Sequence, residues 1–337
     1  MNPLVSVVIP AYNGDAFLRD ALRSVVRQTE TSWEAIVVDD GSIDTTPAIA
    51  REAAAAHPRI HYVRQDNCGT QPARNAALAR ARGAWVALLD QDDVWAPEKL
   101  EKQLALLDRF PNANLLFTNY TDWDGSNDLS LRYRPGRSLP AGDITAELAG
   151  SCLFQASTVL VPRALVSSVG GFDPAYHFSG DWHLWLKLAL RHSIEARGTR
   201  EPLVRYRIWG GNESLRAVRM HREVVAMLEM LAEGADARRS GQAPALRRSA
   251  RRARARLELA ELADPATDDR SAPERLWRAW RCRPSAVRLL LRALLCALPE
   301  ALGGRHFRRN VVARLRRKHR PFAIPSPLPA SAHEESA

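Results

Sequence analysis

The chain has 337 residues, 46% of them hydrophobic, and a formal net charge of +10. This length is enough to bury a sizeable core and to form two domains. Its four cysteines form no Cys-x-x-Cys pair and have no histidine at zinc-ligand spacing, so neither a disulfide framework nor a structural zinc site is indicated. No stretch reaches the roughly 18 uncharged apolar residues of a membrane-spanning helix. Because the first residues lack the pattern of a secretory signal peptide, we expect a cytoplasmic protein.

Segments with strand and helix periodicity alternate along the first part of the chain. The expected strands cover residues 5–9, 35–38, 60–63, 84–89 and 113–118. Apolar residues recur at helical spacing over residues 17–26, 45–56, 73–82 and 97–109. This alternation predicts an α/β fold with a mostly parallel sheet, helices on both faces, and ligands at the C-terminal ends of the strands. Residues 125–142 are polar and rich in Gly, Pro and Ser, which is typical of a mobile loop or lid.

Two adjacent acids, Asp39 and Asp40, end the second expected strand and lead into a helix. Both cannot point into the core, and a carboxylate can accept hydrogen bonds from a nucleobase imide or a ribose hydroxyl. Gly41 would let the backbone come close to a ring. We interpret Asp40 mainly as a ligand-binding residue and Asp44 mainly as a helix cap. The alternative is that Ser42 or Asp44 caps the helix and that no ligand is bound here.

Three carboxylates, Asp90, Asp92 and Asp93, directly follow the apolar run 84–89. Side chains two residues apart in an extended segment project to the same side, so Asp90 and Asp92 share one side at the mouth of the strand. A hard divalent ion suits such oxygen ligands and commonly takes one or two carboxylates together with substrate phosphates. The alternative is a solvated acidic turn that caps the helix beginning near Pro97.

Four segments, in their order and spacing, resemble glycosyltransferase family 2, whose fold is the GT-A nucleotide-sugar-binding α/β domain. They are Ser6–Asn13, Val38–Asp44, Ala73–Ala77 and Leu89–Asp93. The resemblance covers roughly residues 4 to 215. It implies an enzyme, a glycosyltransferase of the hexosyltransferase type, that takes its sugar from a nucleoside-diphosphate sugar.

The resemblance also implies the residues of the site. The nucleotide-sugar pocket would include Pro10, Ala11, Tyr12, Asn13, Asp40, Arg74, Asp90 and Gln91. Asp40 would meet the base, and Arg74 would assist with nucleotide or phosphate contacts. Asp90, Asp92 and Asp93 would surround a Mn²⁺ or Mg²⁺ ion on the donor diphosphate.

The segments Gly171–Asp173 and Gly180-Asp181 resemble the family's Gly-Gly-Phe-Asp segment and its later Glu-Asp pair, whose second acid is the catalytic base. Asp181 matches that acid, while Gly180 replaces the glutamate. The carboxylate would take the acceptor hydroxyl's proton as its oxygen displaces the nucleoside diphosphate from the opposite face, so the sugar inverts. An N-cap role for Asp181 in the next helix is compatible with this. His183 is a rival base, but its Trp and Leu neighbours favour a packed or solvent-facing side chain.

The positive charge is confined to the C-terminal part of the chain. Residues 1–215 hold 22 Lys and Arg against 25 Asp and Glu, a net charge of −3, whereas residues 216–337 hold 26 against 13, a net charge of +13. We therefore place a catalytic domain at 1–215, a basic helical region at 216–320 and a disordered tail at 321–337. The Leu, Val and Arg stretches suit a helix lying on an anionic membrane surface, and a solvated helical bundle fits them equally. Few aromatic residues lie among these arginines, which argues against a nucleic acid partner.

Together these features predict an inverting, metal-dependent glycosyltransferase, peripheral on the inner face of the cell membrane, that moves one sugar to a hydroxyl of a glycan or lipid-linked acceptor. The Gln-x-x-Arg-Trp segment of the family's processive polysaccharide synthases does not occur, which favours a single transfer. By analogy, such an acceptor suits bacterial surface-polysaccharide biosynthesis. Two alternatives stay open. One is a nucleotidyltransferase acting on sugar phosphates, which would not need Asp181, and the other is a non-catalytic nucleotide-sugar-binding scaffold that recruits partners through the basic tail.

Overall fold

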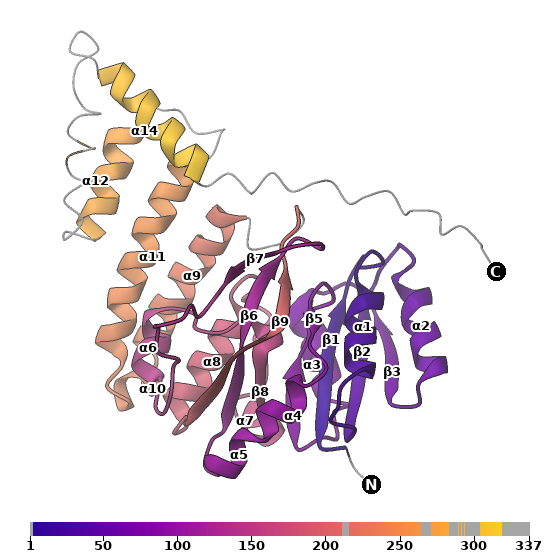
Figure 1. Cartoon of the computed structure of the whole chain (residues 1–337). Coiled ribbons are helices and arrows are strands. Elements are labelled where there is room, and N and C mark those ends of the chain that lie inside the picture. The colour runs from indigo at the N-terminus through magenta and orange to yellow at the C-terminus, as the bar shows by residue number, and fades with distance from the viewer. Residues whose placement is uncertain are drawn as a thin grey trace. The chain divides into compact units, whose positions relative to one another are not determined.

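The computed structural model describes residues 3–210, 216–263, 271–282 and 304–318, together with Leu289, Leu291 and Ala293 (Figure 1). Within residues 304–318, side chains are described for residues 307–314. The chain divides into two compact units, one of residues 1–207 and 223–250 and the other of residues 208–222 and 251–337. The domain boundary after residue 215 stays a prediction, and the expected disordered tail lies outside the described residues.

One sheet forms the frame of the first unit. Its strands are β1 (Val5–Ala11), β2 (Trp33–Asp40), β3 (Ile60–Gln65), β4 (Trp85–Leu88), β5 (Val94–Trp95), β6 (Leu115–Trp123), β7 (Asp128–Leu131), β8 (Val159–Pro162) and β9 (Ala196–Arg207). They lie in the order β3-β2-β1-β4-β8-β6-β9-β5, with β7 paired to β6. The strands β3, β2, β1 and β4 are parallel, whereas β8 is antiparallel to both β4 and β6. The predicted α/β fold is confirmed, and its parallel arrangement is complete only in the first half of the sheet.

Helices connect and cover these strands. They are α1 (Leu18–Val26), α2 (Thr46–Ala56), α3 (Thr70–Leu78), α4 (Lys99–Leu104), α5 (Leu106–Arg109), α6 (Thr145–Gly150), α7 (Arg163–Ser168), α8 (Gly180–Arg191) and α10 (Ala235–Arg239), with the 3-10 helix η1 (Ala156–Thr158). Two longer helices, α9 (Ala217–Glu233) and α11 (Ala243–Ala263), contribute residues to both units.

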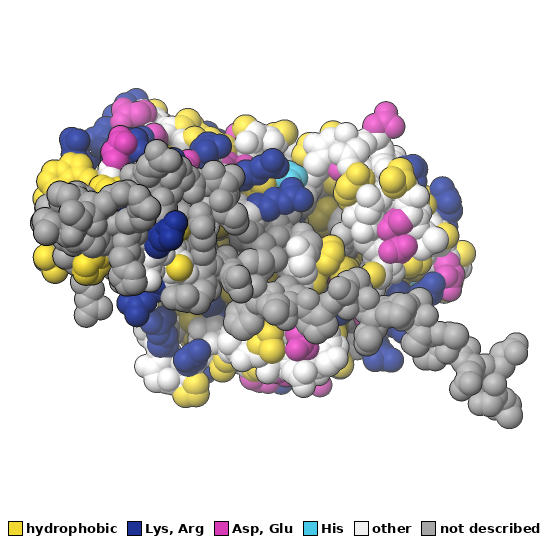
Figure 2. Space-filling model, turned by 90° about the horizontal axis from the view of Figure 1, so that it is seen from above, with side chains coloured by type: hydrophobic (Ala, Val, Ile, Leu, Met, Phe, Trp, Pro, Cys, Tyr) yellow, Lys and Arg dark blue, Asp and Glu magenta, His cyan; other side chains and the backbone are white. Residues whose placement is uncertain are grey.

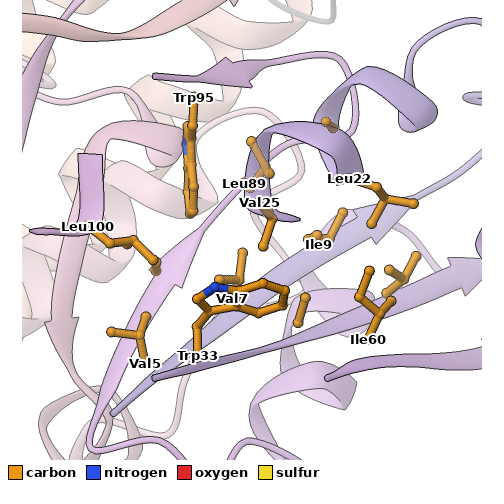
Figure 3. Packing of buried hydrophobic residues seen from close by; sticks show 14 of the residues in the cluster. Val5, Val7, Ile9, Leu22, Val25, Trp33, Ile60, Leu89, Trp95 and Leu100 are labelled. Atoms are coloured by element: carbon orange, nitrogen blue, oxygen red, sulfur yellow. The ribbon is translucent and has the colours of Figure 1, made fainter. Parts of the chain in front are cut away.

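The main hydrophobic core lies between the parallel strands and the helices α1, α2 and α4 (Figure 3). Val7 of β1 and Trp33 of β2 lie side by side at its centre, with Val25 of α1 above them. Full burial of each such side chain stabilises the fold by about 1.5–3 kcal/mol. Because side chains alternate along a strand, Ser6 and Val8 face the opposite side of β1, where α3 packs against β1 and β2.

Two expected boundaries shift for local reasons. β1 continues through Pro10 to Ala11, although the strand was expected to end before the proline. The carbonyl of Val8 accepts a hydrogen bond from Leu89 N–H, so the backbone polar groups of Val8 point toward β4. Those of Pro10, two residues further on, point the same way. Pairing with β4 ends at Val8, so the missing N–H of Pro10 costs no hydrogen bond there. The second shift is α3, which begins at Thr70 instead of residue 73 because Gly69, with a φ of 98°, turns the chain directly before it.

Two other expectations are corrected. The helix expected over 97–109 is interrupted at Ala105, between α4 and α5. The polar stretch at 125–142 is not loop throughout, since it contains β7, which pairs antiparallel with β6.

The second unit contains the helices α12 (Ala272–Cys282) and α14 (Gly304–Lys318). Its buried apolar cluster includes Leu262 of α11, Leu276 of α12 and Val312 of α14. Arg275 of α12 forms ion pairs with Glu258 and Glu261 of α11. On the face drawn in Figure 2, Lys and Arg side chains lie in small groups, several beside Asp or Glu. None of the helices in the described ranges is both long and apolar enough to cross a membrane.

Candidate active site

The segments that follow β1, β2 and β4 meet at one edge of the sheet, because these strands are parallel neighbours. Ala11 at the end of β1 pairs with Asp39 of β2, and β4 ends beside Val8. Ligands of open α/β sheets bind at such an edge. The predicted nucleotide-sugar residues lie on these strand ends and loops, except Arg74, which α3 brings to the same edge.

Gln91 holds the loop after β1 from the neighbouring β4 side. Tyr12 N–H donates to Gln91 Oε1 at 2.9 Å, and Gln91 Nε2 donates to the carbonyl of Tyr12 at 3.0 Å. A Cβ atom on Gly14 would lie 2.1 Å from Gln91 Oε1, so only glycine leaves room for this side chain. The Tyr12 side chain, which is 45% exposed, is thereby carried on a fixed backbone, while Pro10 and Ala11 are buried.

Asn13 joins the same loop to the loop after β2. Its backbone has a φ of 45°, in the left-handed region that asparagine tolerates better than most residues. Asn13 N–H donates to Ser42 Oγ, and Asn13 Oδ1 accepts from Ile43 N–H, both at 3.0 Å. The two loops therefore form one rigid rim.

Asp40 is 3% exposed and both its carboxylate oxygens accept hydrogen bonds from the protein. Oδ1 accepts from Gln65 Nε2 at 2.7 Å and from Cys68 N–H at 3.0 Å, and Oδ2 accepts from Gly69 N–H at 2.8 Å. These bonds fix the turn that leads into α3, a structural role that the sequence interpretation did not include. Contact between Asp40 and a base stays a prediction.

Asp44 lies at the start of α2, as the capping interpretation expected. Its Oδ1 accepts from Thr46 N–H at 2.9 Å, although Thr45 is the residue at the N-cap position. Asp39 is fully buried and accepts from Tyr62 Oη at 2.9 Å and Arg64 Nη1 at 2.8 Å. Both side chains therefore stabilise the loop after β2.

Asp93 lies inside the protein, with its side chain fully buried. Its Oδ2 accepts from Ser157 Oγ at 2.5 Å and its Oδ1 accepts from Arg207 N–H at 3.0 Å. Burial, together with repulsion from Asp92 and Asp90, raises the pKa of Asp93 well above its usual range. With both oxygens engaged, Asp93 supports the acidic segment from within, and its role as a metal ligand stays a prediction that these hydrogen bonds do not favour.

Asp90 and Arg74 form an ion pair at the edge of the sheet, with 2.6 Å between Arg74 Nη2 and Asp90 Oδ1. The Arg74 side chain is 6% exposed and also donates from Nη1 to Gln71 Oε1 at 3.2 Å. Its guanidinium lies 5.2 Å from the centroid of the Phe172 ring. Arg74 is thus held rigidly, with its charge next to the acidic segment.

The residues present fit a divalent ion held by fewer protein ligands than predicted. Asp92 and Asp90 supply hard carboxylate oxygens, which suit Mn²⁺ or Mg²⁺ when substrate phosphates and water complete the ligands. Within the described ranges, no group of three or more His, Cys, Asp and Glu side chains is arranged to hold a metal ion. The metal ligands themselves stay a prediction, for which Asp92 and Asp90 are the accessible carboxylates to consider.

Arg207 locks the acidic segment from the end of β9. Its Nε donates to the carbonyl of Asp92 at 2.9 Å, and its guanidinium lies 4.2 Å from the Trp123 ring centroid and 4.8 Å from that of Phe17. Sequence reasoning did not assign this role. Arg207 is separated from Asp92 by 115 positions, and no local pattern signals a contact over such a distance.

Asp181 lies in the first turn of α8. Ser179 is the N-cap residue, so the expected N-cap role of Asp181 is wrong by two positions. Removal of the carboxyl from solvent raises the pKa of Asp181 to about 6, even though the positive charge of Arg74 opposes the shift. The charge of Asp90 contributes to the same shift, so Asp181, Arg74 and Asp90 act on one another at the same edge. A carboxylate with this pKa is suited to accept a proton near neutral pH.

The glycine at position 180 is explained by a steric restriction that the sequence did not reveal. A Cβ atom there would lie 2.4 Å from Cδ of Gln71. Gln71 is 2% exposed, donates from Nε2 to the carbonyl of His177 at 3.2 Å, and accepts from Arg74. Where the family pattern has glutamate, this chain therefore has the side chain of Gln71 in the available space.

The His183 side chain is packed inside the protein, which is one of the two placements expected from the sequence. It is 2% exposed, and its ring centroid lies 4.2 Å from that of Tyr176. Burial lowers the pKa of His183 to about 4, with a further contribution from the charge of Lys187. These properties do not suit a base that must meet an acceptor from solvent.

Comparison with known sequences identifies the class of the protein. The model of the family described as Glycosyl transferase family 2 matches residues 6–154. A relative from Bacillus subtilis (strain 168), named "Putative teichuronic acid biosynthesis glycosyltransferase TuaG", is 36% identical over 210 residues, which are 61% of this chain and 79% of TuaG. The Escherichia coli UDP-Glc:alpha-D-GlcNAc-diphosphoundecaprenol beta-1,3-glucosyltransferase WfgD is 29% identical over 194 residues, or 57% of this chain and 72% of WfgD.

Solved structures share the fold. TarS 1-349 of S. aureus in complex with UDP-GlcNAc aligns with a TM-score of 0.56 and 16% identity, over 94% of this chain and 90% of that one. The mannosyltransferase PcManGT from Pyrobaculum calidifontis, in complex with GDP-Man and Mn²⁺, aligns with a TM-score of 0.56 and 18% identity, over 94% and 87%. The fold is GT-A, and the protein is a glycosyltransferase. Within that class, the chain belongs to glycosyltransferase family 2.

Proposed function

We propose that this glycosyltransferase transfers one sugar, with inversion, from a nucleoside-diphosphate sugar to a hydroxyl of a glycan or lipid-linked acceptor. The observation that carries the proposal is the environment of the Asp181 carboxyl. This carboxyl has a pKa raised to about 6 and lies at the sheet edge beside the Arg74–Asp90 ion pair. One base carboxylate, with a cation beside it for a phosphate leaving group, is what a direct displacement requires.

The chemistry follows from these groups. Asp181 accepts the proton of the acceptor hydroxyl while the hydroxyl oxygen forms a bond to the anomeric carbon of the sugar. The bond from that carbon to the phosphate oxygen breaks, and its electron pair leaves with the nucleoside diphosphate. Because attack comes from the face opposite the leaving group, the configuration inverts. The charge of Arg74 stabilises the diphosphate as negative charge develops on it.

We assign the divalent ion to Asp92 and Asp90, and Mn²⁺ or Mg²⁺ is the ion that their oxygens suit. When bound, it would neutralise charge on the diphosphate. Arg74 already pairs with Asp90, so donor binding would redistribute charge among Asp90, Arg74 and the phosphates. The Mn²⁺ named with GDP-Man for the structural neighbour PcManGT supports this choice of ion.

For the nucleotide itself we propose the rim formed by Pro10, Ala11, Tyr12 and Asn13 together with Asp40, with Gln91 fixing that rim from beside β4. The exposed side chain of Tyr12 and the rigid backbone around it support this assignment. The UDP-GlcNAc named for the structural neighbour TarS and the UDP-Glc in the name of WfgD support a nucleotide-sugar donor.

The proposed setting is bacterial surface-polysaccharide biosynthesis, which the names of TuaG and WfgD support. WfgD is named for a diphosphoundecaprenol acceptor, so a lipid-linked acceptor is the class to examine first. The basic C-terminal region would then lie on the anionic membrane surface that holds such a lipid.

The test is release of nucleoside diphosphate from a panel of UDP-, GDP- and dTDP-sugars, with Mn²⁺ or Mg²⁺ and with chelator. We expect metal-dependent release from one donor class by the wild type, and loss of about 100-fold or more in Asp181→Asn, in line with removal of a general base. Asp108→Asn, an exposed acid of α5, is the matched control and should behave as the wild type.

Several results would count against the proposal. Full activity in Asp181→Asn would contradict Asp181 as the base. Release of pyrophosphate from a nucleoside triphosphate and a sugar phosphate, with no release of nucleoside diphosphate from any donor, would favour the nucleotidyltransferase alternative. Donor binding by calorimetry without release, in the presence of polyprenyl-diphosphate-linked acceptors, would favour the scaffold alternative. Retention of anomeric configuration in the product would contradict inversion.

A further inference from the structure

Glu223 of α9 holds the segment that leads into α8. Its Oε2 accepts from His177 N–H at 2.8 Å, and its Oε1 accepts from Phe178 N–H at 2.9 Å and from Ser179 N–H at 2.7 Å. Ser179 Oγ donates to the same Oε1 at 2.7 Å. A single carboxylate thus satisfies three consecutive amides and one hydroxyl directly before the helix that carries Asp181. Glu223 and this segment belong to the same compact unit.

The same segment is also connected to the acidic edge. The carbonyl of His177 accepts from Gln71 Nε2 at 3.2 Å, and Gln71 Oε1 accepts from Arg74 Nη1 at 3.2 Å. Arg74 Nη2 then donates to Asp90 Oδ1 at 2.6 Å. An unbroken series of hydrogen bonds therefore runs from Glu223 to Asp90 and passes through His177, in the segment that leads into α8.

We propose that Glu223 is a positioning residue for the catalytic base: its carboxylate fixes the N-terminus of α8 and thereby the place of Asp181 relative to Arg74 and Asp90. This inference rests on the proposed function, since it takes Asp181 as the base. It assigns a role in catalysis to α9, which the sequence placed in a separate basic helical region.

The physical reason is the start of the helix and the segment just before it. Ser179 N–H, at the N-cap, has no partner within the helix, His177 and Phe178 directly precede it, and a negative charge near a helix N-terminus is stabilising. Ser179 is 3% exposed, so water cannot readily replace Glu223 at that residue. Removing the carboxylate would leave buried donors without acceptors, at a cost of about 1–3 kcal/mol for each one that finds no partner. The first turn of α8 would relax to recover those hydrogen bonds, and Asp181 would move with it.

The experiment compares Glu223→Ala, Glu223→Gln and Ser179→Ala in the full chain. Glu223→Gln keeps one acceptor oxygen but turns an NH₂ group toward an N–H donor, and Ser179→Ala removes one of the four bonds. The control is Glu233→Gln, which removes a charge from the same helix at an exposed ion pair with Arg247. For each variant we would measure kcat for diphosphate release, KM, and the affinity and stoichiometry of donor binding by calorimetry.

We expect kcat to fall about 100-fold in Glu223→Ala, as for a misplaced catalytic group, and by a smaller factor in Glu223→Gln and in Ser179→Ala. Donor affinity and the binding stoichiometry should match the wild type, because the donor rim is held by other contacts. A merely structural role predicts the opposite split, in which the binding stoichiometry falls with kcat because less protein is folded. Wild-type kcat in Glu223→Ala would overturn the proposal. If that variant does not fold, wild-type kcat in Ser179→Ala overturns it instead.

Failure of the proposed function is recognised separately. Absence of turnover in the wild type, or full turnover in Asp181→Asn, refutes the base and leaves the anchoring of α8 to be judged by amide hydrogen exchange. In Glu223→Ala the amides of residues 177–183 should exchange faster than in the wild type, while those of α3 exchange as before. Unchanged exchange at 177–183 would refute the anchoring itself, whether or not the protein turns over.

Discussion

Lys99, the first residue of α4, is fully buried, and its Nζ lies 3.8 Å from the centroid of the Trp95 ring. In the part of the chain that the structure describes, this Nζ has no hydrogen-bond partner. A cation over an aromatic ring gains about 2 kcal/mol, whereas an unpaired buried charge costs several kcal/mol. Desolvation therefore dominates and lowers the pKa of Lys99 well below its usual range. Burial therefore favours the neutral amine in the folded protein.

Replacing Lys99 with methionine should stabilise the protein at neutral pH. In the unfolded chain the lysine is protonated below its ordinary pKa of 10.5, so protonation favours unfolding of the wild type over that range. We expect Lys99→Met to raise the free energy of unfolding by about 1–4 kcal/mol at pH 7, with a smaller gain at pH 9.5. Urea denaturation at the two pH values measures this. Lys102→Met, at an exposed site of the same helix, is the control, and a less stable Lys99→Met at pH 7 would contradict the neutral amine.

The raised pKa of Asp181 predicts opposite effects on activity and stability. Activity should rise with pH up to about 6 and level off above it, because the base acts as its anion. The contribution of Asp181 to the free energy of unfolding should be greatest below the ordinary carboxyl pKa of 3.8 and fall as the pH rises toward 6, because the unfolded chain releases this proton more readily. Asp181→Asn, which resembles the neutral carboxyl, should therefore be inactive yet more stable than the wild type at pH 7.5, by up to about 3 kcal/mol.

Kinetics from pH 5 to 8 and thermal melts of both proteins at pH 4 and 7.5 check this prediction. The difference in stability between wild type and variant should nearly vanish at pH 4. A larger difference in stability between wild type and variant at pH 4 than at pH 7.5 would show that burial does not raise the pKa of Asp181.

At the scale of elements, α3 and α8 are fitted together by Gln71 and Gly180. Gly180→Ala would place a Cβ atom 2.4 Å from Cδ of Gln71, and overpacking of this kind costs about 1–3 kcal/mol. In a Gln71→Ala background the space is open, and alanine is the better helix former by about 1 kcal/mol. We therefore expect Gly180→Ala to destabilise the wild type and to be neutral or stabilising in the double variant. A double-mutant cycle of urea unfolding measures the coupling, and additive effects would refute the fit.

Local patterns predicted most of the first elements because those segments obey a single period. The buried strands β1 and β2 and the helix α1 are each continuous in their own apolar spacing. The apolar pattern failed to predict structure that depends on contacts with neighbouring segments. The helix expected at 97–109 is interrupted at Ala105, and β7 forms in a polar stretch because β6 offers it a partner. No strand was predicted at β8 or β9, whose places depend on pairing across the sheet.

At the scale of the whole molecule, the excess positive charge beyond residue 215 predicts binding to anionic lipid. Phe307 and Arg309 are exposed on α14 and represent the apolar and basic components of such a surface. We expect the full chain to bind vesicles of anionic lipid and not zwitterionic ones, with binding lost at high salt. Arg309→Glu should weaken binding about tenfold, since each basic residue near such a surface contributes about 1 kcal/mol.

Cosedimentation with vesicles measures this binding, and Arg80→Glu, at an exposed site beyond α3, is the control. Equal binding to both lipid types, or equal loss in the control, would contradict a membrane surface in the basic region. A soluble binding partner of the basic region would then be the interaction to look for.

The sequence by itself determined the family, the α/β fold and the identity of the acids at the sheet edge, because these depend on short motifs and on periods of two and 3.6 residues. Tertiary structure alone decided what each acid does. Asp93 is turned inward by Ser157 and Arg207, and Asp181, which is partly buried, acquires its raised pKa from desolvation in the folded chain. Glu223 reaches the start of α8 across more than 40 positions. Contacts made over such distances are set by packing, and no local pattern along the chain encodes them.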